Sequence, residues 1–263
     1  MKTGSRDIGY CVKSHRGLKR SQNEDSHVVL TRIWNTDNLV ADAGSLFAVA
    51  DGISGKTGGR IASKMAIEGL RERYSDREAR LAISRSRRPD EIMANLEKAF
   101  FAIHEEISRL AHSVVKYEHM GTTLSVLILT DNMAYIAHVG DSRIYLLRDC
   151  HLKQLTRDDT IAQLSVEMGY LQADEAQGHP LSHALVQALG QGVDDLYTKK
   201  VGIQSGDVFL LCSDGLYDMI SEGQITEILQ TNTKGNTPCD SLIEAALENG
   251  GKDNVTVIVV NVP

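Results

Sequence analysis

Acidic residues lie beside several apolar segments of the chain, where strands are expected to begin or end. A single Asp-Gly pair is usually turn chemistry, because both residues accommodate tight backbone conformations. Here the arrangement repeats, and carboxylates that meet at strand ends would repel one another unless cations neutralised them. The acidic positions are Asp51 after SLFAVA, Asp141 after YIAHVG, Asp214 after VFLLCS, Asp253 with Asn254 before VTVIVV, and Glu24 with Asp25 before SHVVL.

The types of these residues indicate a particular metal chemistry. Hard oxygen ligands without a cluster of His and Cys suit Mg²⁺ or Mn²⁺ better than zinc, and Gly52 would let its backbone approach closely and lend a carbonyl. Two such cations, roughly 3.5–4 Å apart, would generate a hydroxide from a bridging water and clamp phosphoryl oxygens. Arg20, just ahead of the Glu24-Asp25 pair, could bind phosphate through two N–H groups. Residue types alone therefore predict a binuclear metal site that hydrolyses phosphate esters.

The stretch VADGISGKTGGR permits a second interpretation. Ala50–Thr57 nearly matches the Walker A phosphate-binding pattern, with alanine in place of the first glycine. A P-loop nucleotide-binding protein needs this loop between a strand of a parallel sheet and a helix. The other strands of this chain are expected to be antiparallel, which disfavours that alternative. Lys56 stays a candidate for contact with phosphate.

The elements that must position these residues can be predicted from hydrophobic periodicity. Helical periodicity occurs in 59–74, 90–112 and 240–248. Asp131-Asn132 is expected to turn 124–130 back into 133–139, and 140–142 to turn the chain again into 143–148, which would make a meander. Hairpins between helix pairs favour an α+β fold with packed antiparallel sheets and helices outside them. Apolar runs predict strands at 27–31, 45–50, 123–130, 133–139, 143–148, 207–212 and 254–262.

Two segments stand apart from this pattern. Segment 71–89 is rich in arginine and is interpreted as a helix end and a solvated loop, with docking to an acidic partner as the weaker alternative. Segment 156–192 holds two short helical patterns joined by QGHPLSH and no strand. We interpret it as an excursion from the core, a flap over a site.

Composition limits the class of protein. The chain has 263 residues, 42% of them hydrophobic, and a formal net charge of -7, which disfavours binding to nucleic acid or to an anionic membrane. The sequence has no hydrophobic signal region and no membrane-spanning run. The cysteines, Cys11, Cys150, Cys212 and Cys239, are widely spaced, so we expect free thiols in a reducing, cytoplasmic compartment.

Seven motifs follow one another along the chain: RSQNEDS (20–26), VADGISG (49–55), GTT (121–123), HVGDSRIYLL (138–147), LTRDD (155–159), LCSDGLYD (211–218) and GKDNVTVIVV (251–260). In this order and spacing they resemble a known family, the metal-dependent Ser/Thr protein phosphatases of type 2C, in the form of its bacterial stand-alone branch. The resemblance extends over nearly the whole chain and implies one phosphatase domain over 1–263. It implies a four-layer α-β-β-α sandwich, with two central antiparallel sheets flanked by helix pairs.

The resemblance also implies roles for individual residues. Asp51, Asp214 and Asp253 would ligate metal directly, the Gly52 carbonyl would complete one shell, and Glu24 and Asp25 would hold metal directly or through water. Arg20 would bind phosphate, Asp141 would help to hold a third metal, and segment 156–192 would be the family's flap.

The activity implied by the resemblance is hydrolysis of phosphoserine and phosphothreonine on proteins. A metal-bridging hydroxide would be the nucleophile, with Mn²⁺ or Mg²⁺ as cofactor, two ions per site and a third in many bacterial members. A Ser/Thr kinase would be the opposing enzyme. We expect a monomer with neither nucleic acid nor membrane as partner.

The sequence departs from the family pattern near the first aspartate. Ile53 stands where many members have a histidine that is a proposed general acid, Ser54 replaces a glycine, and Lys56 replaces a histidine of bacterial members. The flap motif reads Asp158-Asp159-Thr160, where Asp-His-Ser is usual. No metal ligand is lost, so activity is expected to survive. The alternative is a catalytically weak pseudo-phosphatase that acts as a phosphoprotein-binding scaffold.

Several other polar residues have plain structural interpretations. His104 in HEEIS lacks a second zinc-site histidine and is expected on a solvated helix face. His138 is expected to be packed, and Cys212 to be a buried, inert thiol. Ser213 lacks a base and is not expected to be a nucleophile. The pair His179 and His183 is ascribed to chance, with contact to substrate as the alternative.

Overall fold

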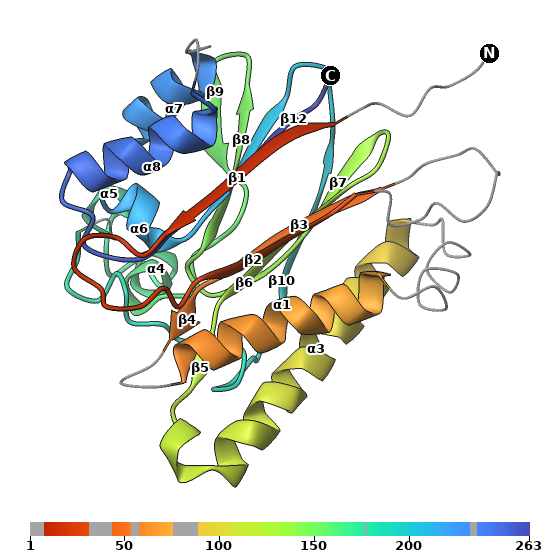
Figure 1. Ribbon diagram of the computed structural model, residues 1–263, viewed down its shortest axis with the longest axis vertical. Helices are drawn as coiled ribbons and strands as arrows, with labels where there is room; N and C mark the ends of the chain where they lie inside the picture. Colours follow the sequence, from red (N-terminus) through yellow and green to blue (C-terminus); the bar gives the residue numbers. More distant parts are fainter. Residues whose placement is uncertain (1–7, 32–43, 54–57, 76–88, 177, 232–235) are drawn as a thin grey trace.

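The protein is described by a computed structural model that covers residues 8–31, 44–53, 58–75, 89–176, 178–231 and 236–263. Two five-stranded antiparallel sheets form its centre, in the orders β1-β12-β11-β8-β9 and β10-β7-β6-β3-β2 (Figure 1). A short pair, β4 (Gly52–Ile53) and β5 (Gly121–Thr122), lies apart from both. The strands of the two sheets are β1 (Gly9–His15), β12 (Val255–Asn261), β11 (Val208–Cys212), β8 (Arg143–Arg148), β9 (His151–Gln154), β10 (Tyr197–Gly202), β7 (Met133–Val139), β6 (Leu124–Leu129), β3 (Ser45–Ala50) and β2 (Ser26–Leu30).

The central strands are apolar along their whole length because both of their faces are buried. On β3, Phe47 and Val49 enter the core between the two sheets. The alternate residues Leu46, Ala48 and Ala50 pack against the helices outside. This period of two is the ordinary geometry of a strand, and it explains why the run SLFAVA contains no exposed position.

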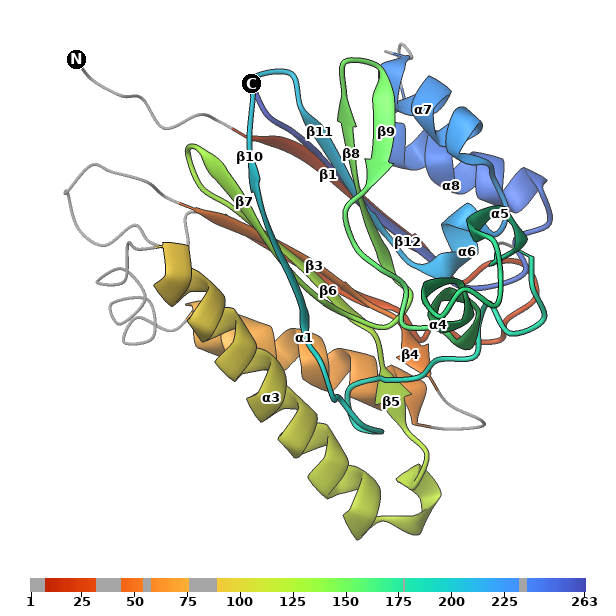
Figure 2. The same ribbon diagram turned by 180° about the vertical axis from the view of Figure 1, so that it is seen from behind.

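Helices cover the outer faces and complete four layers, as predicted. On one side, α1 (Gly59–Ser75) and α3 (Pro89–Ser113) pack on the sheet that contains β3. On the other side lie α6 (Asp214–Tyr217), α7 (Glu222–Gln230) and α8 (Pro238–Glu248), as Figures 1 and 2 show from opposite directions. Helix α7 was not predicted from the sequence, although its capping box of Ser221 and Gln224 is a recognisable helix start.

Three edge strands were also missed. The strands β1, β9 and β10 contain only exposed and half-buried residues, which alternate in β9 and β10, and all three carry charged or polar side chains such as Lys13, Lys153 and Lys199. Each pairs on one side only, with β12, β8 and β7 respectively. Edge strands of this composition have no apolar run to mark them, because their stability comes from the neighbouring strand.

The predicted meander is wrong at its second turn. The hairpin from β6 to β7 forms as expected, but β8 lies in the opposite sheet. Gly140, with φ of 105°, lies in the connection, and a Cβ there would lie 2.5 Å from Cγ2 of Thr123. The turn 140–142 therefore carries the chain from one sheet to the other and holds Asp141 at the end where they approach.

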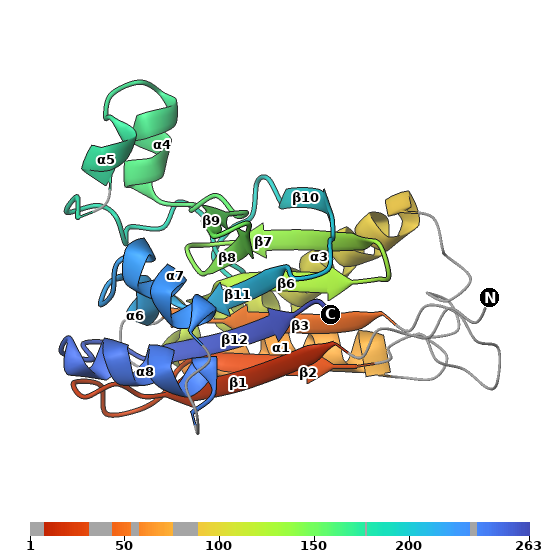
Figure 3. The same ribbon diagram turned by 90° about the horizontal axis from the view of Figure 1, so that it is seen from above.

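Segment 156–192 leaves the two sheets, as predicted, but its internal structure differs from the prediction. Its helices α4 (Ile161–Glu167) and α5 (Ala173–Ala176) both precede residue 177, so they are not joined by 177–183. The later part returns through isolated bridges, Thr160 with Leu185 and Ala188 with Gly192. Figure 3 shows α4 and α5 projecting beyond the sheets. Most of the arginine-rich segment 71–89 lies outside the described residues. Among the described helices, none is long and apolar enough to cross a membrane.

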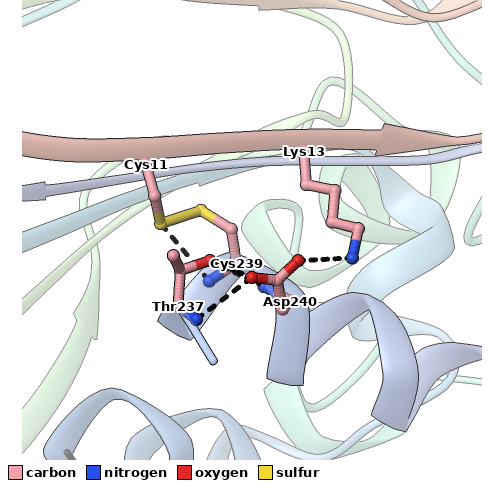
Figure 4. The surroundings of a disulfide bond; sticks show 5 residues. All are labelled: Cys11, Lys13, Thr237, Cys239 and Asp240. Atoms are coloured by element: carbon pink, nitrogen blue, oxygen red, sulfur yellow. Dashed lines mark hydrogen bonds and ion pairs between the residues drawn. A yellow bond between two sulfur atoms is a disulfide. The ribbon is translucent and has the colours of Figure 1, made fainter. Parts of the chain in front are cut away.

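The expectation of four free thiols is wrong for one pair. Cys11 on β1 and Cys239 at the start of α8 form a disulfide, with their Cα atoms 6.1 Å apart (Figure 4). They are separated by 228 residues, so only the tertiary fold, in which α8 packs beside β1 and β12, brings them together. Cys150 and Cys212 are free. Since disulfides persist mainly in oxidising compartments, the cysteines no longer support a reducing one.

Candidate metal centre and phosphate site

The acidic residues predicted as ligands gather at one end of the two sheets. Most of them surround a cavity of about 390 Å³, whose wall includes the residue after β3, the β7–β8 connection, the start of α6, Glu24 ahead of β2 and the residue pair before β12. Segment 156–192 adds His183 and Leu185 to the wall. The predicted residues that line the cavity are Arg20, Glu24, Asp51, Gly52, Asp141, Asp214 and Asp253.

Asp25 lies behind this wall and is held by two hydroxyl groups. Its Oδ2 accepts hydrogen bonds from Ser213 Oγ at 2.8 Å and from Thr256 Oγ1 at 2.7 Å. Its Oδ1 is buried and has no hydrogen-bond partner among the described residues. Burial raises the pKa of this carboxyl to about 6, against the two hydrogen bonds that lower it. One oxygen is thus fixed by the protein while the other is left available to a ligand.

Asp51 and Asp214 show the same signs of an uncompensated charge. Oδ1 of Asp214 is buried without a partner in the described part of the chain. Burial raises the pKa of Asp214 well above its usual value, and repulsion from Asp141 adds to the shift. Burial likewise raises the pKa of Asp51, with further contributions from Asp25 and Asp214. Acids that destabilise one another in this way, with orphaned oxygens, fit divalent cations with hard oxygen ligands.

The backbone around Asp51 is fixed by the GTT motif. The Asp51 carbonyl accepts hydrogen bonds from Thr122 Oγ1 at 2.8 Å and from Thr123 N at 2.9 Å, and Asp51 N donates to Thr123 Oγ1 at 2.9 Å. At Gly52, an added Cβ would lie 2.3 Å from the backbone of Gly59. The motif was recognised in the sequence without a role, and its two threonines orient the loop that carries Asp51 and Gly52.

Asp141 is fully enclosed and is positioned by residues from both neighbouring motifs. Its carbonyl accepts a hydrogen bond from Tyr217 Oη at 3.0 Å, and the Arg143 guanidinium lies 3.7 Å from the centre of the Tyr217 ring. Arg143 in turn forms a bidentate pair with Asp158 at the root of segment 156–192. Burial, together with repulsion from Asp158, raises the pKa of Asp141 to about 7.

Arg20 lines the cavity, and its proposed contact with phosphate stays a prediction. Its Nη2 donates to Asp253 Oδ2 at 2.5 Å, and its side chain is 54% exposed. The neighbouring Asn254 was not predicted as a site residue. Its Oδ1 accepts from Glu24 N at 2.8 Å and its Nδ2 donates to the carbonyl of Gln22, so it holds the N-terminal loop that bears Arg20 and Glu24.

His183 lies among the acids of the cavity, although its presence in the sequence was ascribed to chance. Its Nδ1 lies 3.6 Å from Asp214 Oδ2, and its Nε2 lies 3.3 Å from Asp218 Oδ2. One oxygen of Asp141, one of Asp214 and one nitrogen of His183 lie within 4.8 Å of one another, close enough to hold a metal ion. No periodicity marks His183, because only the return of segment 156–192 brings it to the acids. His179, by contrast, does not line the cavity.

Other residues agree largely with their structural interpretations. His138 is buried and hydrogen-bonded to Ser125, and burial raises the pKa of Cys212 to about 12, as an inert thiol requires. The prediction for His104 is wrong in part, because this half-buried side chain accepts a hydrogen bond from Gly190 N. Ile53 lines the cavity, whereas Ser54 and Lys56 lie outside the described residues.

The topology also decides against the P-loop interpretation. The strand that precedes this loop, β3, pairs antiparallel with both of its neighbours, β2 and β6. A P-loop follows a strand of a parallel sheet, whose neighbours point the same way. The near-match to Walker A at 50–57 is therefore a coincidence of sequence.

The fold and the site together define a two-sheet sandwich with an acid-lined cavity, suited to divalent cations, at one end. Comparison with known proteins identifies the family. The model for protein phosphatase 2C matches residues 21–249, and the chain belongs to that family. It is 36% identical over 97% of its length to the serine/threonine protein phosphatase PstP of Mycobacterium tuberculosis, of which it spans 45%. It is 35% identical to the serine/threonine phosphatase stp of Listeria monocytogenes, over 94% of this chain and 93% of that one.

Solved structures support the same assignment. The serine/threonine phosphatase of S. agalactiae superposes with a TM-score of 0.86 at 27% identity, covering 97% of this chain and 100% of that one. The catalytic domain of PstP, solved in complex with two manganese ions, superposes with a TM-score of 0.78 at 34% identity, covering 97% of this chain and 98% of that one.

Proposed function

We propose that this chain is a Mg²⁺- or Mn²⁺-dependent protein phosphatase that removes phosphate from phosphoserine and phosphothreonine on proteins. The observation that carries the proposal is the acid-lined cavity, with Asp214 in its wall and Asp25 behind it, because each of these residues keeps one buried oxygen that has no partner among the described residues. Such oxygens are costly to bury unless a cation binds them. The activity also agrees with the named functions of the relatives.

Each predicted residue takes a defined part in this proposal. Asp51, Asp214 and Asp253, with the Gly52 carbonyl and with Glu24 and Asp25, would hold two divalent cations, and Asp141 would contribute to a third. When bound, the cations supply a water of lowered pKa and neutralise phosphoryl oxygens. Arg20, now paired with Asp253, would turn one N–H edge to the substrate phosphate and orient it. Lys56 follows the cavity residue Ile53 by three positions in the sequence and is proposed as a further contact to phosphate.

The apolar Ile53 in the cavity wall can neither donate nor accept a proton. The leaving serine or threonine alkoxide must therefore obtain its proton from another group or from water.

The wider setting of the enzyme follows from the activity. We propose one phosphatase domain over 1–263 with segment 156–192 as its flap, acting as a monomer on phosphorylated proteins in opposition to a Ser/Thr kinase. Since kinases require ATP, the proposed location is the bacterial cytoplasm, and the proposed role is signalling. The thiol state of Cys11 and Cys239 in intact cells tests the location, because a reducing compartment should keep both alkylatable.

Purified protein tests the activity directly. Hydrolysis of an aryl phosphate and of a phosphothreonine peptide should require Mn²⁺ or Mg²⁺ and should stop when a chelator is added. A protein that binds the phosphopeptide but never turns it over in Mn²⁺ would instead be the pseudo-phosphatase, and the proposal would be withdrawn.

A further inference from the structure

A second cavity adjoins the metal cavity and shares part of its wall. We call it the side pocket. It also measures about 390 Å³, and His183, Asp218 and Asp253 line both cavities. Its remaining wall includes Tyr217, Met219 and Lys252. A polypeptide whose phosphorylated residue reached the metal cavity would therefore have neighbouring residues at the side pocket.

The charges around the side pocket are unequally engaged. Asp253 accepts hydrogen bonds on both oxygens, from Arg20 at 2.5 Å and from the backbone of Asn254 at 2.7 Å. Asp218 faces the His183 ring at 3.3 Å. Lys252 is exposed and makes no hydrogen bond or ion pair with any described residue, but its charge acts on Asp218 in the same wall. Burial raises the pKa of Asp218, and the positive charge of Lys252 opposes that rise. Its ammonium group is thus the charge in this wall that a ligand can still engage.

Tyr217 and Met219 form a partly apolar floor of the side pocket. Tyr217 is only 7% exposed, its hydroxyl is tied to the Asp141 carbonyl, and its ring lies against the Arg143 guanidinium. Met219 adds a half-buried thioether side chain. An aliphatic stem that ends in an anionic group would pack on this floor and place its charge beside Lys252.

We propose that the side pocket binds an anionic group of the substrate chain close to the phosphoserine or phosphothreonine, with Lys252 as its counter-ion. The inference rests on the proposed phosphatase function and adds a preference among its substrates. A glutamate side chain or a second phosphoryl group would supply the same chemistry. For a partly exposed ion pair, we expect a preference of roughly three- to fivefold over the neutral analogue.

The test is a set of phosphothreonine peptides in an alanine background. Each position from three before to three after the phosphothreonine carries Glu, Gln, Lys or phosphoserine in turn, and kcat/KM for release of the threonine phosphate is measured in Mn²⁺. At one or two positions the wild type should prefer Glu and phosphoserine over Gln, and should disfavour Lys. In Lys252→Glu the order should reverse, with Lys above Gln and Gln above Glu.

The comparison with Lys153→Glu removes any general effect of net charge. Lys153 is exposed on the edge strand β9 and lines neither cavity, so this variant should keep the wild-type order. Equal rates on Glu, Gln and Lys peptides in the wild type, or a Glu preference that persists in Lys252→Glu, would overturn the inference. The relative gains with Glu and with phosphoserine identify which anion the pocket takes. Failure of the wild type on every peptide would instead overturn the phosphatase function.

Discussion

At the scale of single residues, the centre works by leaving carboxylate oxygens incompletely satisfied. Asp25 uses one oxygen for Ser213 and Thr256 and buries the other, and Asp214 also buries an oxygen; neither buried oxygen has a partner in the part of the chain that the structure describes. A structural carboxylate of the same fold shows the contrast, because Asp207 is 1% exposed and its two oxygens both accept from Arg148. Residues of one type are thus distinguished by how many partners the protein supplies.

Asp214→Ala should reduce Mn²⁺-dependent turnover of an aryl phosphate by at least about 100-fold, because it removes a proposed ligand, and loss of supporting residues alone costs 10–100-fold at metal sites. Asp149→Asn is the matched control. Asp149 is exposed in the β8–β9 turn with φ of 50°, a conformation that asparagine tolerates. A rate for Asp214→Ala close to that of the control would refute the site assignment.

Ser213 was set aside as a nucleophile, and the structure gives it a positioning role. Its Oγ donates to Asp25 and accepts from Thr256 N at 3.0 Å. Ser213→Ala should raise the Mn²⁺ concentration needed for half-maximal activation by roughly 10–100-fold, while turnover at saturating Mn²⁺ falls much less. The exposed Ser205→Ala serves as control. Unchanged Mn²⁺ activation in Ser213→Ala would show that the hydroxyl does not position a ligand.

At the scale of elements, the sequence predicted the strands and helices whose burial leaves a clear apolar pattern. Central strands such as β3 and β12 could be located because burial on both faces demands continuous apolar runs. The helices α1 and α3 could be located from their periodicity. Strand β10 could not, since its sequence YTKKVG has two lysines and its pairing with β7 supplies its stability. The position of His183 could not be predicted either, because the tertiary course of segment 156–192 brings this residue to the acids.

The disulfide ties an edge element, β1, to the helix α8. Cross-linking residues 228 positions apart restricts the unfolded chain strongly. Under oxidising conditions, Cys239→Ser should therefore lower the free energy of unfolding by about 2–4 kcal/mol, measured by guanidinium denaturation. In reductant the difference from the wild type should largely vanish.

The control for this prediction is Cys150→Ser, which changes an exposed free cysteine and should have little effect in either condition. Alkylation of the native, oxidised protein should label Cys150 and neither Cys11 nor Cys239. Labelling of all three in protein purified without reductant would contradict the disulfide.

At the scale of the whole molecule, the centre exists because two sheets end at the same place. Asp51 follows a strand of one sheet, whereas Asp214 follows β11 of the other. The sequence could predict that the acids lie at strand ends, but it could not assign the strands to sheets. The turn 140–142 illustrates this: it has the composition of a hairpin turn, yet it joins β7 to β8 across the sandwich. The family resemblance supplied the convergence that periodicity alone left open.

The stability of the metal-free protein should depend on pH because the converging carboxyl groups are buried close together. Burial raises the pKa of Asp25 to about 6 and that of Asp141 to about 7, above the ordinary value of 3.8. For a carboxyl whose pKa is raised by folding, the folded state binds more protons than the unfolded state between the two values. Its contribution to stability is therefore fully present below about pH 4 and is lost as the pH rises through 6 to 7.

Asp141→Asn isolates this effect, because it removes one titrating charge and keeps the size of the side chain. In chelator, the variant should melt higher than the wild type at pH 8, by an amount on the order of 5 °C, and should match it more closely at pH 5. Mn²⁺ should raise the melting temperature of the wild type more at pH 8 than at pH 5, because Asp25 and Asp141 are largely ionised at pH 8 and protons compete less with the metal. If the difference in melting temperature between variant and wild type stayed constant from pH 5 to pH 8, burial would not raise the pKa of Asp141.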